Sequence, residues 1–134
     1  MKHILIIDDE APVREVLGRA LTRQTYRVTQ AANAAEARQA VQQQRPDLII
    51  TDLQMEDTDG LELVRELKNL APGVPVLLLT GVIFDPEVVE KTIRHRVEGY
   101  LEKTVPLQRV LEEVRRLLTL PPAGLIPPES SPPR

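Results

Sequence analysis

The chain has 134 residues, of which 42% are hydrophobic, and a net charge of −3. This length fits one domain with a real core, and the charge provides no positive field for nucleic acid. Aromatic residues make up only 2% and cysteine is absent, which excludes a base-stacking platform, a disulfide framework and a thiolate site. The first apolar run is broken by Asp8, too early for a signal peptide or a membrane span. We therefore expect a cytoplasmic protein without membrane contact.

The first half of the chain alternates short apolar runs with amphipathic stretches. Three aliphatic or β-branched runs are predicted strands, over 3–7, 27–31 and 47–51. Pro12 suits the first turn of a helix that ends before Thr25. Asn33 and Glu36 resemble a capping box that opens a second helix, which stops before Pro46.

The second half continues the same alternation. Two further strands are predicted over 76–79 and 99–102, and helices over 60–70, from Asp85 onward, and over 107–118. Asp85 and Pro86 combine an N-cap with a proline at the first helical position. Five strands alternating with five helices predict an α/β fold, a doubly wound parallel sheet with helices on both faces.

The predicted strand ends carry the polar residues of a candidate site. Asp8 and Asp9 follow the first strand, Asp52 the third, Thr80 the fourth and Lys103 the fifth. These ends meet at the edge of the sheet where open α/β folds bind ligands. Two carboxylates about 4 Å apart repel by about 4 kcal/mol at an effective dielectric of 20, so the cluster requires a compensating cation.

The residue types at these strand ends suit phosphoryl transfer to a carboxylate. Asp52 is the candidate nucleophile, because an aspartate can accept a phosphoryl group as an acyl phosphate. Asp8 and Asp9 are candidate Mg²⁺ ligands, since Mg²⁺ is held by one or two carboxylates and keeps several waters. Lys103 and Thr80 are placed to meet the remaining phosphoryl oxygens.

Four motifs in this order resemble the receiver domain of bacterial two-component response regulators. They are IIDDE at 6–10, DLQMEDTDGLEL at 52–63, LLLTG at 77–81 and GYLEK at 99–103. The resemblance covers about residues 3–118 and implies a flavodoxin-like fold with the strand order 2-1-3-4-5. We accordingly divide the chain into a receiver domain over 1–118 and a Pro-rich tail or linker over 119–134.

The resemblance also implies a role for each residue of the site. Asp52 would accept a phosphoryl group from a sensor histidine kinase or a phosphotransfer protein, with Lys103 and Thr80 assisting. Mg²⁺ would be held by Asp8, Asp9, Asp52 and the backbone carbonyl of Gln54. Thr80 and Tyr100 would switch the surface of the fourth helix, fifth strand and fifth helix. That surface would then control an effector protein or output domain, or form a homodimer, and the chain would catalyse only its own phosphorylation and dephosphorylation.

Three positions depart from the family pattern. Receivers usually carry a proline after the conserved lysine, whereas Thr104 follows Lys103 here. A cis bond without proline costs about 2.5 to 4 kcal/mol, so we predict a trans Lys103–Thr104 bond. Glu56 replaces a usual proline and adds negative charge near Asp52, and bulky residues occupy 94–97, where small ones are usual.

Other classes of protein fail on particular residues. A P-loop nucleotidase or a flavodoxin that binds FMN is excluded because the first strand ends in acids, which repel phosphate. A haloacid-dehalogenase-like phosphatase needs a second Asp two positions after the nucleophile, where Gln54 stands. The alternative kept open is a receiver-fold interaction module that acts independently of phosphorylation.

Overall fold

The computed structural model describes residues 1–55, 58–81 and 85–119. A parallel five-stranded sheet consists of β1 (His3–Ile7), β2 (Arg27–Ala31), β3 (Leu48–Thr51), β6 (Val76–Thr80) and β7 (Gly99–Glu102). The helices are α1 (Ala11–Arg23), α2 (Ala34–Gln43), α3 (Gly60–Leu70), α4 (Pro86–Val88), which continues as the π-helix η1 (Val89–Ile93), and α5 (Leu107–Leu118). Strand order β2-β1-β3-β6-β7 confirms the predicted doubly wound fold.

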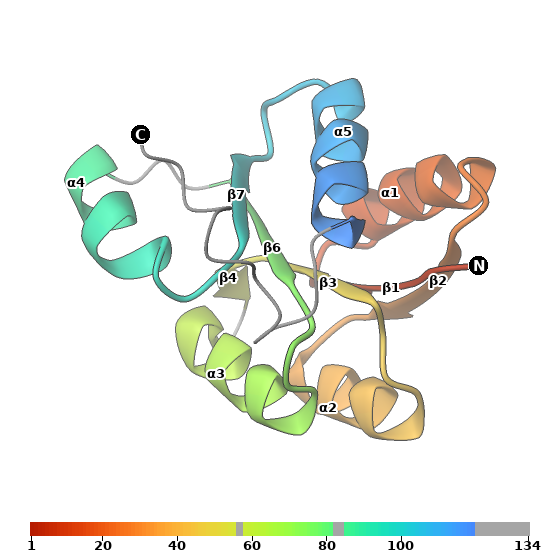
Figure 1. Cartoon of the computed structure of the whole chain (residues 1–134), viewed down its shortest axis with the longest axis horizontal. Coiled ribbons are helices and arrows are strands. Elements are labelled where there is room, and N and C mark those ends of the chain that lie inside the picture. The colour runs from red at the N-terminus through yellow and green to blue at the C-terminus, as the bar shows by residue number, and fades with distance from the viewer. Residues whose placement is uncertain (56–57, 82–84, 120–134) are drawn as a thin grey trace.

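Helices cover both faces of the sheet. Figure 1 shows α1 and α5 together on one side and α2, α3 and α4 along the other. Successive residues of a strand point to opposite faces, so Leu77 and Leu79 enter the core under α1 and α5, while Val76 and Leu78 enter the core under α2 and α3. The central strands β1, β3 and β6 are therefore buried on both faces, as expected for a parallel sheet.

Two of the predicted helix starts, at Asn33 and Asp85, are confirmed by their caps. The Asn33 side chain accepts from the backbone N–H of Glu36 at 2.9 Å, and the Asp85 side chain accepts from Glu87 N–H at 2.8 Å. The Glu36 carboxylate accepts from the N–H of Ala32 at 2.8 Å, one residue before the N-cap itself. The second arm of the predicted capping box is thus displaced by one residue.

Two local elements were not predicted. A small antiparallel ribbon joins β4 (Gln54–Met55) to β5 (Thr58–Asp59), directly after the Asp52 loop. The predicted fourth helix has only three α-helical residues before it widens into η1, where Arg94 N–H donates to the Val89 carbonyl at 2.8 Å. Two-residue strands are too short to produce a hydrophobic period, and a change from α-helical to π-helical hydrogen bonding does not alter which residues are apolar. Neither element could therefore be predicted from the sequence.

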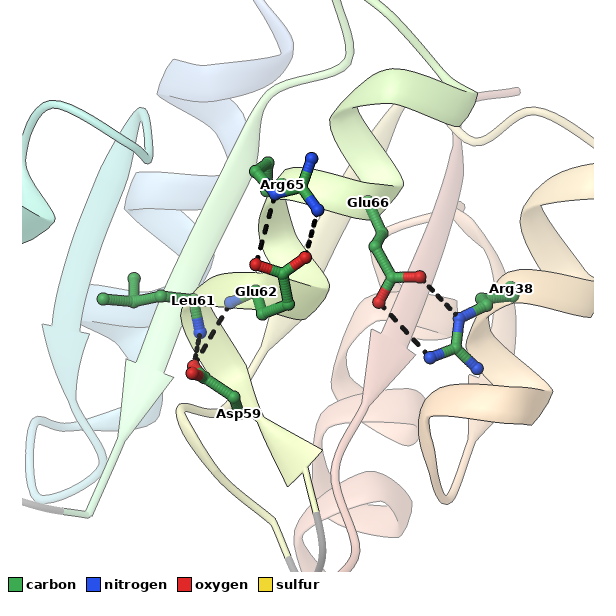
Figure 2. A network of polar contacts seen from close by, with 6 residues as sticks. All are labelled: Arg38, Asp59, Leu61, Glu62, Arg65 and Glu66. Atoms are coloured by element: carbon green, nitrogen blue, oxygen red, sulfur yellow. Dashed lines mark hydrogen bonds and ion pairs between the residues drawn. The ribbon is translucent and has the colours of Figure 1, made fainter.

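Polar contacts fix the start of α3 and join it to α2. Figure 2 shows the Asp59 carboxylate at the N-terminus of α3, where it accepts from the backbone N–H groups of Leu61 and Glu62 at 3.1 and 3.2 Å. In the same view Arg38 of α2 pairs with Glu66 of α3 at 3.0 Å. The chain is thereby anchored soon after the loop that carries the candidate nucleophile.

Close backbone approach explains the glycine that opens α3. A Cβ atom at Gly60 would lie 2.5 Å from both the Cα and the carbonyl oxygen of Leu53. No side chain can be accommodated there, so Gly60 lets α3 begin beside the residue that follows Asp52.

Parts of the prediction lie outside the described residues. They include Glu56 and all of the predicted tail after Thr119. Within the described part, α5 ends at Leu118. Two residues of the predicted apolar stripes are exposed, Val16 of α1 at 56% and Leu107 of α5 at 40%.

Candidate functional site

The sheet brings the predicted site residues to one edge. β1 and β3 are neighbours with Ile7 opposite Thr51, so the next residue of each strand, Asp8 and Asp52, emerges side by side. Thr80 ends β6, and Lys103 directly follows β7. The parallel register alone thus gathers residues that are far apart in the sequence.

Lys103 is the centre of this edge. Its Nζ lies 2.7 Å from Asp52 Oδ2 and 2.9 Å from Asp8 Oδ2. Both aspartate side chains are only 4% exposed and the lysine side chain 17%. A single ammonium therefore lies between two buried carboxylates and offsets part of their negative charge, which lowers their mutual repulsion in a medium of low dielectric.

The second oxygen of each aspartate is fixed by the backbone. Asp8 Oδ1 accepts from the N–H of Glu10 at 2.8 Å, and Asp52 Oδ1 accepts from the N–H of Gln54 at 3.0 Å. Each carboxylate is thus held in one orientation by a turn of its own loop and presents its other oxygen to Lys103. The predicted role of the Gln54 carbonyl stays a prediction.

Burial and pairing shift the pKa values of Asp8 and Lys103. Burial raises the pKa of Asp8 above its ordinary value, although the hydrogen bond from Lys103 opposes the change. For Lys103, burial acts to lower the pKa, but hydrogen bonds with Asp52, Asp8 and Glu10 outweigh it and raise the pKa above its ordinary value. Lys103 is consequently a permanent cation at neutral pH.

The remaining predicted residues surround this pair. Asp9 is exposed next to Asp8, and Thr80 is completely buried on β6. Tyr100 lies on β7 opposite Leu78, is partly buried, and packs against the core under α2, α3 and η1 with its hydroxyl buried. Their roles in metal binding and switching stay predictions.

The donor chemistry at this edge fits Mg²⁺. Mg²⁺ prefers oxygen ligands and uses one or two carboxylates beside its waters, which the oriented carboxylates of Asp8 and Asp52 could supply. Within residues 1–55, 58–81 and 85–119, no group of three or more acidic or imidazole side chains is arranged so that it could hold a metal ion by itself. The position between the two aspartates is instead taken by Lys103.

Two further features concern Lys103. The described residues contain no cis peptide bond, so the Lys103–Thr104 bond is trans, as predicted. The second feature is Glu10, whose Oε1 lies 3.0 Å from Lys103 Nζ. Glu10 belongs to the IIDDE motif, but the sequence alone predicts no role for it; its position directly after Asp9 is the available signal.

Comparison with known proteins shows the family of the chain. Residues 4–115 match the response regulator receiver domain, and the chain belongs to this family. The transcriptional regulatory protein GlrR of Escherichia coli is 35% identical over 103 residues, which cover 77% of this chain and 23% of that protein. The response regulator MprA of Mycobacterium leprae is 34% identical over 123 residues, covering 87% of this chain and 50% of that protein. The chain therefore spans from about a quarter to half the length of these relatives.

Solved structures support the same assignment. A CheY-like receiver domain protein of Methanospirillum hungatei superposes with a TM-score of 0.80 at 26% identity, covering 88% of this chain and 94% of that one. The response regulator TrrA of Thermotoga maritima, in complex with Mg²⁺-BeF, gives a TM-score of 0.77 at 28% identity, covering 87% and 99%. In the described part of the chain, no helix has the length and apolar character needed to span a membrane.

Proposed function

We propose that this receiver domain accepts a phosphoryl group on Asp52 in a Mg²⁺-dependent reaction. The observation that supports it is the placement of Lys103 Nζ, 2.7 Å from Asp52 Oδ2 and 2.9 Å from Asp8 Oδ2. The backbone orients both carboxylates, and the cation lies where charge develops during the transfer.

In the proposed step, an Asp52 carboxylate oxygen attacks phosphorus. A bond forms between phosphorus and that oxygen, while the bond to the phosphohistidine nitrogen of the donor breaks and its electron pair leaves with the imidazole. Lys103 stabilises the charge spread over the equatorial oxygens, and the Thr80 hydroxyl, at the end of the neighbouring strand, donates to the phosphoryl group. Hydrolysis of the aspartyl phosphate would reset the domain, so the chain would act only on itself.

A bound Mg²⁺ would neutralise phosphoryl oxygens. Asp8, Asp9, Asp52 and the Gln54 carbonyl are the groups proposed to hold it. The TrrA structure in complex with Mg²⁺-BeF is a precedent in a similar domain.

We propose that the phosphorylated state is read at the surface of α4, β7 and α5. Thr80 and Tyr100 occupy adjacent strands, so a displacement of the Thr80 hydroxyl toward Asp52 would alter the space into which the Tyr100 ring packs. The partners would be a sensor histidine kinase or phosphotransfer protein for input, and an effector protein or output domain for output. We place this exchange in the cytoplasm.

The proposal is tested by intact-protein mass after incubation with Mg²⁺ and acetyl phosphate. We expect one phosphoryl adduct that requires Mg²⁺ and is absent from Asp52→Asn. The matched control is Asp47→Asn, at the opposite end of the sheet, where the carboxylate accepts from the His3 N–H; this variant should still be phosphorylated. No adduct with acetyl phosphate, a second donor and a candidate kinase would favour the interaction module that acts without phosphorylation.

A further inference from the structure

We propose that Glu10 is a positioning residue that holds Lys103 in the resting site and competes with the incoming phosphoryl group for its ammonium. This inference rests on the proposed function of Asp52. Three carboxylates contact Lys103, those of Asp8, Asp52 and Glu10. Glu10 is the one that is not among the proposed Mg²⁺ ligands.

All donors of the Lys103 ammonium are directed at carboxylates. An ammonium group has three N–H donors. The structure places Asp52 Oδ2 at 2.7 Å, Asp8 Oδ2 at 2.9 Å and Glu10 Oε1 at 3.0 Å from Nζ. A phosphoryl oxygen can therefore bind this ammonium only if one of these carboxylates gives up its place.

The local structure directs Glu10 toward Lys103. Glu10 is the N-cap residue of α1, yet its side chain makes no capping hydrogen bond. Its backbone N–H is used to orient Asp8 Oδ1, at 2.8 Å. The same residue thus fixes one site carboxylate through its backbone and reaches the site cation through its side chain.

Burial identifies Glu10 as the partner that gives way. Its side chain is 60% exposed, whereas those of Asp8 and Asp52 are 4% exposed. An exposed pair contributes little because water replaces it at small cost, while breaking a buried pair strands a charge. Glu10 also places negative charge at the mouth of the site, where an anionic donor must approach. The contact between Glu10 and Lys103 should consequently slow phosphorylation by a small factor, which substitution of Glu10 would remove.

The test compares variants of Glu10 in the full chain, with acetyl phosphate and Mg²⁺ and with adduct formation followed by intact mass. Glu10→Gln removes the charge and weakens the contact. Glu10→Asp keeps the charge but is one methylene shorter, so it loses the contact. Glu15→Gln removes a charge from an exposed position of the same helix and is the matched control.

We expect both Glu10 variants to be phosphorylated about three-fold faster than the unmodified chain, in line with the small strength of an exposed ion pair, and Glu15→Gln to be unchanged. Mg²⁺ affinity, followed by chemical shifts of backbone amides, should fall in Glu10→Gln and stay in Glu10→Asp. Equal or slower phosphorylation of Glu10→Gln would overturn the role, as would Glu10→Asp behaving like the unmodified chain. Failure of the unmodified chain to form an adduct dependent on Asp52 would instead overturn the proposed function.

Discussion

The two ends of the sheet use their carboxylates differently. At the amino end, Asp47 accepts from the N–H of His3 at 2.7 Å, and Glu98 accepts from the N–H of Val76 at 2.8 Å, so these acids tie neighbouring strands together. At the carboxyl end, Asp8 and Asp52 satisfy N–H groups of their own loops and share one lysine. Carboxylates at the amino end complete the backbone pairing, whereas those at the carboxyl end share the charge of one ammonium group.

The sharpest way to break this comparison is to remove a lysine from each end. Lys103→Met leaves two buried carboxylates without a cation and should lower the free energy of unfolding by about 3 kcal/mol. Lys68→Met removes the partner of Glu98, where both side chains are about one-third exposed, and should cost below about 1 kcal/mol. Urea unfolding measures both, and added Mg²⁺ should restore part of the loss in Lys103→Met only. Equal losses at the two ends would contradict the comparison.

A smaller effect is expected from glycines at the two ends. A Cβ at Gly99, which starts β7, would lie 2.8 Å from Glu113 Oε2 and 2.9 Å from Leu117 Cδ1, so Gly99→Ala should cost about 2 kcal/mol. Among the described residues, a Cβ at Gly81 would meet only Lys103 Cδ, at 3.7 Å, so Gly81→Ala should change stability by less than about 0.5 kcal/mol. Thermal unfolding of both variants tests this, and a greater loss in Gly81→Ala would show that the carboxyl end is the more tightly packed.

The smallest effect concerns pH at the amino end. Burial, together with the nearby Arg27, lowers the pKa of His3 below its ordinary value of 6.5. The unfolded chain then binds a proton more readily than the folded one, so this contribution to stability is complete above pH 6.5 and is lost as the pH falls below it. Urea unfolding at pH 7.5 and pH 5 should show a greater loss for the unmodified chain than for His3→Gln. The exposed His95→Gln is the control, and a loss in His3→Gln equal to that of the unmodified chain would contradict the prediction.

The sheet and most of the candidate site could be predicted from the sequence because both depend on local signals. Aliphatic runs located the strands, and the residue after each run was enough to bring Asp8, Asp52 and Lys103 together once the strands were parallel. Gly60 and Glu10 could not be assigned in this way. Their roles depend on distances to Leu53 and Lys103, which only the folded chain defines.

The π-helix could not be predicted from the sequence for a different reason. Periodicity detects which residues face the core, and Val89 and Ile93 are both buried, four residues apart as an α-helix would also require. The hydrogen-bond ring that distinguishes the two helices is set by packing around the segment, which hydrophobic pattern does not encode.

The sharing of each central strand between two cores has a consequence for cooperativity. In β6, alternate residues belong to the layer of α1 and α5 and to the layer of α2 and α3. Neither layer can melt without loosening strands that the other layer needs, so the helices should unfold together in a single transition. Because the carboxylates stand at the ends of these shared strands, disorder in any helix layer would disperse them. The proposed phosphoryl transfer to Asp52 would therefore require both helix layers to be folded.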